Sequence, residues 1–125
     1  MTIEPLQERG EYWQDVMGLN TWKIRFTYAL PHELKDAWAD ADYDQYHQTA
    51  LIRVLHPQFS HLQKWPVPEY DVDFSLVHEL VHLMLDPLNV NDVEEGPEFT
   101  NLEQTVNKIT EVIISLENQA NEQID

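Results

Sequence analysis

The stretch Val77-His78-Glu79-Leu80-Val81-His82-Leu83 decides how the rest of the chain must be arranged. Its two histidines are four positions apart, so on a helix their imidazoles point the same way and both reach one metal ion. Glu79 sits beside the first histidine, close enough to accept a proton from a metal-bound water without being a ligand itself. The spacing therefore predicts a helix that carries a metal site.

The flanks of this stretch predict that the helix is buried. Residues 73 to 86 are apolar on almost every side of the expected helix, as in helices that lie inside a protein. At about 100° per residue, the polar side chains from Ser75 onward fall within one arc roughly 100° wide. They are Ser75, His78, Glu79, His82 and Asp86. A buried helix with one polar arc presents that arc to a site. The alternative is a pair of core histidines, each hydrogen-bonded to a backbone carbonyl.

Composition narrows the class of protein. The chain has 125 residues, of which 42% are hydrophobic, and this suits a single domain over residues 1–125 with a modest core. Cysteine is absent, which excludes disulfides, thiolate zinc sites and a cysteine nucleophile, and leaves histidine and carboxylate as metal ligands. No stretch approaches the length of a membrane span, and Glu4 and Glu8 stand where a signal peptide would carry positive charge. We therefore expect a cytoplasmic protein that does not bind membranes.

The chain is strongly acidic, with a formal net charge of −16 and only seven Lys and Arg residues. Such a surface repels phosphate backbones, so we do not expect direct binding of nucleic acid. A basic partner, or a peptide or protein substrate with a basic segment, would be attracted instead. Simple solubility is the alternative explanation of the charge. An acidic mimic of nucleic acid would also fit the charge, but it leaves the histidine helix unexplained.

Before the histidine helix, the sequence predicts one helix and a small sheet. Apolar residues at helical spacing predict a helix over residues 3–19, with Gly18 as its C-terminal stop. Strict alternation over residues 21–28 predicts a half-buried strand. A short strand is expected at residues 37–39, followed by an acidic turn, and a third strand is expected within residues 46–55. The acidic turn holds Asp40, Asp42 and Asp44.

After the histidine helix, Pro87 stops helical geometry, and a long helix is expected from Pro97 to about Asn118. Its apolar stripe consists of Phe99, Leu102, Val106, Ile109, Ile113 and Leu116. The chain from residue 121 onward is expected to fray. Together these elements predict an α+β fold. A sheet of about three strands packs on the buried histidine helix and on the long C-terminal helix, with an additional N-terminal helix.

A catalytic zinc site normally has three protein ligands, so a third ligand is needed in addition to His78 and His82. We expect the other histidines to be surface or packing residues: His32, His47, His56 and His61. The acidic candidates downstream are Glu94, Glu95, Glu98 and Glu103. Glu103 lies about 90° from the centre of the apolar stripe, at the flank of the face that packs inward. Its alternative role is in a capping box with Thr100 as the N-cap. Phe99 is in phase with the stripe, which places the helix start at Pro97 and favours the ligand role.

These residues resemble a known group of enzymes. A buried His78-Glu79-Leu80-Val81-His82 helix, preceded by a small sheet and followed by a helix with a glutamate, is similar to gluzincin-type zinc metallopeptidases. The match covers mainly residues 72–116 and looks most like the minimal ImmA/IrrE-type family, often encoded by phages and mobile elements. The resemblance implies a zincin-like domain with Zn²⁺ held by His78, His82 and Glu103, and with Glu79 as general base. It also implies an edge strand, within residues 46–55, that holds an extended peptide by strand addition.

Two functions remain open at this point. The first is a zinc-dependent metallopeptidase that hydrolyses peptide bonds, and the intact Glu79 favours it because a structural site needs no base. The second is a non-catalytic, zinc-stabilised acidic interaction protein, such as a phage accessory or regulatory factor. Fuller gluzincins carry a Tyr or His after the third ligand to stabilise the oxyanion, whereas no His, Tyr or Arg follows Glu103 here. The candidates elsewhere are Tyr43, Tyr46 and Tyr70.

Overall fold

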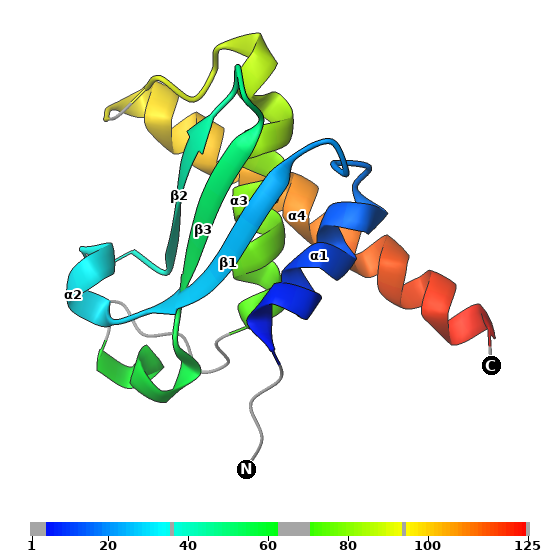
Figure 1. Ribbon diagram of the computed structural model, residues 1–125. Helices are drawn as coiled ribbons and strands as arrows, with labels where there is room; N and C mark the ends of the chain where they lie inside the picture. Colours follow the sequence, from blue (N-terminus) through cyan, green and yellow to red (C-terminus); the bar gives the residue numbers. More distant parts are fainter. Residues whose placement is uncertain (1–4, 36, 63–70, 94, 125) are drawn as a thin grey trace.

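The computed structural model describes residues 5–35, 37–62, 71–93 and 95–124. Within these residues three strands form one sheet, and α1, α3 and α4 lie on one side of it (Figure 1). In chain order the elements are α1 (Leu6–Val16), β1 (Lys23–Ala29), α2 (Pro31–Leu34), β2 (Ala39–Asp44), β3 (Thr49–Leu55), η1 (Pro57–Leu62), α3 (Val72–Leu85), η2 (Asp86–Leu88) and α4 (Pro97–Ile124). The predicted α+β fold is confirmed, with its small sheet, N-terminal helix, histidine helix and long C-terminal helix.

The sheet has the strand order β1–β3–β2, so β1 and β2 are its edges. β1 runs parallel to β3, with Lys23 opposite Thr49, and β2 runs antiparallel to β3. The predicted alternation of the first strand is confirmed up to Phe26, because Ile24 and Phe26 are buried whereas Lys23 and Arg25 are exposed. The strand itself ends at Ala29, one residue beyond the predicted range.

The expectation that residues 46–55 hold an edge strand is wrong. β3 begins at Thr49 and has a neighbouring strand on each side. Residues 45–48 form the turn that precedes it, with Gln48 at a φ of 52°. The burial of β3 explains its position. Val54 and Leu55 are adjacent and point to opposite faces of the sheet, yet both are fully buried, as in strands that lie inside a sheet.

The predicted short strand and acidic turn are also wrong, because the three aspartates belong to β2. They alternate along the strand with residues that pack against the core, namely Ala39, Ala41 and Tyr43. Arg53 on β3 donates to both carboxylate oxygens of Asp40, at 2.9 Å and 2.5 Å. Aspartate has a low propensity for strands, and alanine is only weakly apolar, so the local sequence does not indicate this strand. Pairing with β3 overrides the local preference.

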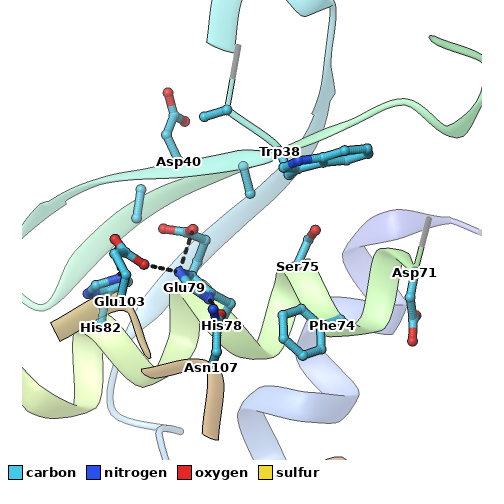
Figure 2. Close-up of a pocket in the computed structure, with 13 residues that line it drawn as sticks. Trp38, Asp40, Asp71, Phe74, Ser75, His78, Glu79, His82, Glu103 and Asn107 are labelled. Atoms are coloured by element: carbon cyan, nitrogen blue, oxygen red, sulfur yellow. Dashed lines mark hydrogen bonds and ion pairs between the residues drawn. The ribbon is translucent and has the colours of Figure 1, made fainter. Parts of the chain in front are cut away.

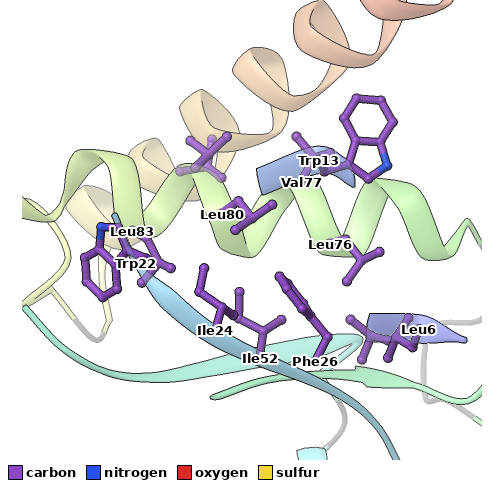
Figure 3. Close-up of a cluster of buried hydrophobic side chains, with 13 residues drawn as sticks. Leu6, Trp13, Trp22, Ile24, Phe26, Ile52, Leu76, Val77, Leu80 and Leu83 are labelled. Atoms are coloured by element: carbon purple, nitrogen blue, oxygen red, sulfur yellow. The ribbon is translucent and has the colours of Figure 1, made fainter. Parts of the chain in front are cut away.

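α3 lies between the sheet and α4, as Figure 3 shows, which explains why almost all of its sides are apolar. The fully or almost fully buried side chains of α3 are Leu76, Val77, Leu80, Val81 and Leu83. Each such burial stabilises the fold by about 1.5–3 kcal/mol. The helix begins after Asp71, whose carboxylate accepts a hydrogen bond from the backbone N–H of Asp73 at 2.9 Å.

Two contacts hold α1 against the sheet and against α3. A Cβ atom at Gly10 would lie 2.4 Å from the ring of Phe26, so only glycine allows this approach. Arg9 forms a bidentate ion pair with Asp73, and the indole N–H of Trp13 donates to the same carboxylate at 3.1 Å. α1 is shorter than predicted and ends at Val16, while Gly18 has the positive φ of 71° expected of a stop. Residues 1–4 lie outside the described part.

α4 begins at Pro97 as predicted but continues to Ile124, so its predicted end near Asn118 and the expected fraying from residue 121 are wrong. Neither Gly nor Pro occurs after Pro97, so nothing in the local sequence stops the helix. Val106 is fully buried, whereas Leu116 is 60% exposed, and the last turns extend beyond the rest of the molecule (Figure 1). Among the described residues, no helix combines the length and the apolar character needed to cross a membrane.

Candidate metal centre

α3 and α4 bring two imidazoles and one carboxylate together. His78 and His82 lie one turn apart on α3, and Glu103 reaches them from α4 (Figure 2). Nε2 of His78 lies 2.9 Å from Oε2 of Glu103, and Nε2 of His82 lies 3.6 Å from Oε1 of Glu103. One ligand atom from each residue lies within 4.8 Å of the other two. The structure thus brings together the three residues that the sequence suggests as ligands.

Two asparagine side chains hold the imidazoles on the side away from Glu103. Nδ1 of His78 lies 2.9 Å from Oδ1 of Asn107, and Nδ1 of His82 lies 2.9 Å from Oδ1 of Asn91. Asn91 Nδ2 donates to the backbone oxygen of His82 at 2.7 Å, which orients the amide with its oxygen toward the ring. An amide oxygen only accepts, so Nδ1 of His82 carries a proton and donates it to Asn91, and the amide of Asn107 as it lies gives Nδ1 of His78 the same role. Each Nε2 is then available as a ligand.

This arrangement requires a positive charge among the three groups. Two Nε2 lone pairs and a carboxylate repel one another at these distances unless a proton or a metal ion lies between them. A zinc ion bound tetrahedrally at about 2.0–2.1 Å would hold its ligand atoms about 3.3 Å apart. The separations of 2.9 Å and 3.6 Å bracket that value. Two imidazoles and one carboxylate are also the ligands of many zinc hydrolases, so the residues present fit Zn²⁺ with one position left for water.

The contacts shift the pKa values of the groups involved. Hydrogen bonds from His78 and then from His82 lower the pKa of Glu103 to about 2. Burial alone would lower the pKa of His82, but its hydrogen bonds with Glu103 and Asn91 outweigh burial, and the pKa is raised. The cluster therefore favours a proton when no metal is bound, and a bound metal would displace that proton.

Glu79 is a separate carboxyl beside this cluster. Its Oε2 lies 4.0 Å from Nε2 of His78, and only 8% of the residue is exposed. Burial raises the pKa of Glu79 to about 7, and a nearby cation would lower it again. A carboxyl with a pKa near neutrality both accepts and releases a proton easily, which suits a general base.

The ligand atoms face a cleft of about 870 Å³ between α3 and the edge strand β2. The residues of α3 that line it are Phe74, Ser75, His78, Glu79 and His82, and those of β2 are Ala39, Asp40 and Ala41. Figure 2 shows Phe74 and Ser75 on the helix side of the cleft, with Trp38 on the opposite wall. Glu79 therefore lies both beside the ligand cluster and in a space that a substrate could enter.

Those competing carboxylates that the structure describes are not part of this site. Glu95 and Glu98 are exposed and do not line the cleft, and Glu94 lies outside the described residues. The capping-box alternative for Glu103 is wrong, because α4 begins at Pro97 and Thr100 therefore lies inside the helix.

No tyrosine with a described side chain lines the cleft. The hydroxyl of Tyr43 donates to Asp86 at 2.8 Å and accepts from Asn91 at 3.2 Å, and burial followed by the hydrogen bond to Asp86 raises its pKa to about 12. Tyr46 is 89% exposed, and Tyr70 lies outside the described residues. Three other histidines lie away from the cleft, as predicted: His32, His47 and His56. The side chain of His61 lies outside the described part.

Sequence reasoning missed two residues of the site, Asn91 and Asn107. Asn107 follows Glu103 by four positions, so both lie on the same face of α4, and this spacing is a signal that could have indicated it. Asn91 lies in the segment between η2 and α4 and belongs to no periodic pattern. Only the packing of that segment against α3 brings it to His82.

Comparison with known proteins does not extend this description, because no protein-family model, curated protein or solved structure matches the chain. The similarity to ImmA/IrrE-type peptidases remains an expectation from the motif. A function must be inferred from the geometry and chemistry of the site itself.

Proposed function

We propose that this chain is a zinc-dependent metallopeptidase, with Zn²⁺ held by His78, His82 and Glu103 and with Glu79 as general base. The strongest support is the pair of amide oxygens that fix both Nδ1 protons, since both Nε2 atoms are then available beside one carboxylate. Two core histidines without a metal would need no such convergence. The cytoplasm is the proposed setting.

A zinc ion held there would lower the pKa of a bound water and polarise the carbonyl of the scissile bond. Glu79, beside His78, accepts one proton from the water while the oxygen of that water adds to the carbonyl carbon. The carbon–nitrogen bond then breaks, and Glu79 passes the same proton to the leaving nitrogen. The products are a carboxylic acid and an amine, which together contain the atoms of the peptide and one water.

β2 is the strand that we propose to hold the substrate, in place of the strand expected within residues 46–55. β2 is an edge of the sheet, and three of its residues line the cleft. An extended peptide that adds to this edge would pass the ligand cluster and Glu79. The net charge of −16 favours a peptide or protein segment with basic residues.

One observation favours the second function, a zinc-stabilised interaction protein without catalysis. The described residues that line the cleft include no Tyr, Arg or Lys, and both histidines among them belong to the ligand cluster. A peptidase needs a donor that stabilises the oxyanion, and removing such a donor typically costs about 10²–10³ in rate. The choice between the two functions therefore depends on a test of catalysis, separate from a test of metal binding.

The replacement Glu79→Gln separates these functions, because the amide keeps the shape of the side chain but cannot accept the proton. Elemental analysis of protein without a histidine tag should find about one zinc per chain in the wild type and in Glu79→Gln, and none in His82→Ala. Peptide libraries analysed by mass spectrometry should be cut by the wild type alone. Zinc that persists in His82→Ala would exclude the site. Full zinc content without any cleavage would favour the interaction protein.

A further inference from the structure

The cleft continues beyond the candidate metal centre, toward the N-terminal end of α3. Phe74 lies one turn before His78, and the centroids of their rings are 6.3 Å apart. Trp38, just before β2, lies on the opposite wall (Figure 2). Both aromatic side chains are half-buried. This part of the cleft is therefore an apolar space beside the ligand cluster, of a kind that accepts a hydrophobic side chain.

Carboxylates also line the cleft, and Figure 2 shows Asp71 at the Phe74 end and Asp40 nearer the ligand cluster. Among the described residues that line it, none is Lys or Arg, whereas Asp40 and Asp71 are present in addition to Glu79 and Glu103. Asp40 is already paired with Arg53 on β3. Asp71 is exposed at the start of α3, and its capping hydrogen bond uses only part of its capacity as an acceptor. Asp71 can therefore attract a cationic side chain that leaves the apolar space.

The direction of β2 indicates how a peptide would lie in the cleft. β2 starts next to Trp38, which lies across the cleft from the Phe74 end of α3 (Figure 2). Tyr43, near the other end of β2, donates a hydrogen bond to Asp86 at the opposite end of α3. β2 and α3 thus run the same way along the cleft. Antiparallel pairing is the more stable form of strand addition. A peptide that pairs antiparallel with β2 would run from the Tyr43 end toward Trp38, so the residues after the scissile bond would lie between Trp38 and Phe74.

Helix and strand dimensions relate these side chains to positions in the peptide. Along α3, Phe74 lies about 6 Å and Asp71 about 10.5 Å before His78. A peptide strand advances about 3.3 Å per residue, and every second side chain points to the same side. The first and third residues after the scissile bond would therefore both point toward α3, the first near Phe74 and the third near Asp71.

We propose that the cleft selects substrates by an apolar residue directly after the scissile bond, held between Trp38 and Phe74, and by Lys or Arg two residues later, held by Asp71. The location of the scissile bond rests on the proposed function. The two side-chain preferences rest on the walls of the cleft, so they can be measured without catalysis.

The test uses zinc-loaded Glu79→Gln, which binds peptides without cutting them, and capped fluorescent peptides in an alanine and serine background. One peptide contains Leu-Ala-Lys, a second contains the reverse order Lys-Ala-Leu, and two others replace either Leu or Lys by Ala. Fluorescence anisotropy should show that Leu-Ala-Lys binds about tenfold tighter than the peptide without Leu. It should bind about two- to fivefold tighter than the peptide without Lys. Tighter binding of the reverse order would overturn the proposal, and so would equal binding of all four peptides.

Three variants in the Glu79→Gln background assign the preferences to residues. Phe74→Ala should remove the preference for Leu and leave the preference for Lys. Asp71→Asn keeps the helix cap, because asparagine caps as well as aspartate, and should remove only the preference for Lys. Asp92→Asn, the same change at an exposed residue outside the cleft, should alter neither preference. If Phe74→Ala unfolds, Phe74→Leu tests the aromatic wall, and the Asp71→Asn result stands by itself.

Cleavage by the wild-type protein distinguishes failure of this inference from failure of the proposed function. If peptides are cut directly before Leu in Leu-Ala-Lys, both hold. If peptides are cut but neither variant changes the preference, the peptidase stands and the subsites are wrong. If no peptide is cut while Glu79→Gln shows the expected binding pattern, the subsites stand and the cleft belongs to a binding protein.

Discussion

Replacing Asn91 by Ala should weaken zinc binding although Asn91 is not a candidate ligand. In the structure its side chain accepts the Nδ1 proton of His82 and donates to the backbone oxygen of His82 and to the hydroxyl of Tyr43. Without this amide, the imidazole of His82 can rotate, and its proton can move to Nε2, the atom proposed to bind zinc. The variant tests whether the amide prepares the site.

The expected magnitude follows from the contacts that are lost. Removing the hydrogen-bond partner of a metal-bound histidine typically costs 10–100-fold in metal affinity, or about 1.4–2.8 kcal/mol. The zinc-free protein should also lose about 1–3 kcal/mol of stability, because the backbone oxygen of His82 and the hydroxyl of Tyr43 lose a donor. Tyr43→Phe should cost about 1 kcal/mol of stability but change zinc affinity less than about threefold, because Asn91 then still holds His82.

The assay is competition for zinc against a chromophoric chelator, combined with urea unfolding of zinc-loaded and chelated samples. Both unfolding conditions are needed, because a bound metal itself stabilises the folded state. Asn101→Ala is the matched control, since it removes an exposed amide from α4. If Asn91→Ala and Asn101→Ala bind zinc equally tightly, the hydrogen bond to His82 does not prepare a metal ligand, and the inferred tautomer has no role in metal binding.

Three further predictions test the ligand set, the packing of α1 and the proton balance of the site. Glu103→Gln should weaken zinc binding by at least about 100-fold, more than the loss of an outer partner does, whereas Glu98→Gln should leave it unchanged in the same competition assay. Gly10→Ala should destabilise the protein by about 1–3 kcal/mol in urea unfolding, because the new methyl group meets the ring of Phe26. A gain in stability, as helix propensity alone would give, would show that the approach is not tight. Stabilisation by zinc should increase from about pH 5.5 to pH 8 in thermal unfolding, since zinc binds deprotonated imidazole. In the zinc-free protein, the raised pKa of His82 stabilises the fold fully below pH 6.5, and the lowered pKa of Glu103 stabilises it fully above pH 4.5. Their contact therefore stabilises the zinc-free protein most between these two pH values, and this contribution falls as the pH rises further, whereas the stabilisation by zinc grows. A stabilisation by zinc that does not change over this range would contradict the histidine ligands.

Periodicity in the sequence correctly indicated the helices and strands whose buried side is marked by a regular pattern of apolar residues within the element itself. The alternation around Ile24 and Phe26 predicted β1, and the apolar surroundings of the histidine motif predicted that α3 is buried. Pro97 marked the start of α4, and the structure, which has this start, excludes the capping box of Thr100 that the sequence had left open. Local patterns were less informative where the fold adds a contact from elsewhere. β2 contains three aspartates, and it is a strand because β3 pairs with it.

The sequence by itself determined the chemistry that is available: two histidines one turn apart, a carboxyl beside the first, and a carboxylate on the inward flank of a later helix. Such spacing is set by the 1.5 Å rise and 3.6-residue turn of one helix, so it can be seen without knowing the rest of the fold. Only the tertiary structure decided which strand borders the cleft, that Glu103 reaches both imidazoles, and that Asn91 holds His82. These contacts join segments distant in the chain, and they depend on how α3 packs between the sheet and α4. That packing is driven by the burial of apolar surface, which is a non-directional effect. The apolar pattern of one helix or strand shows which face is buried, but it does not show which residues of another element that face will meet.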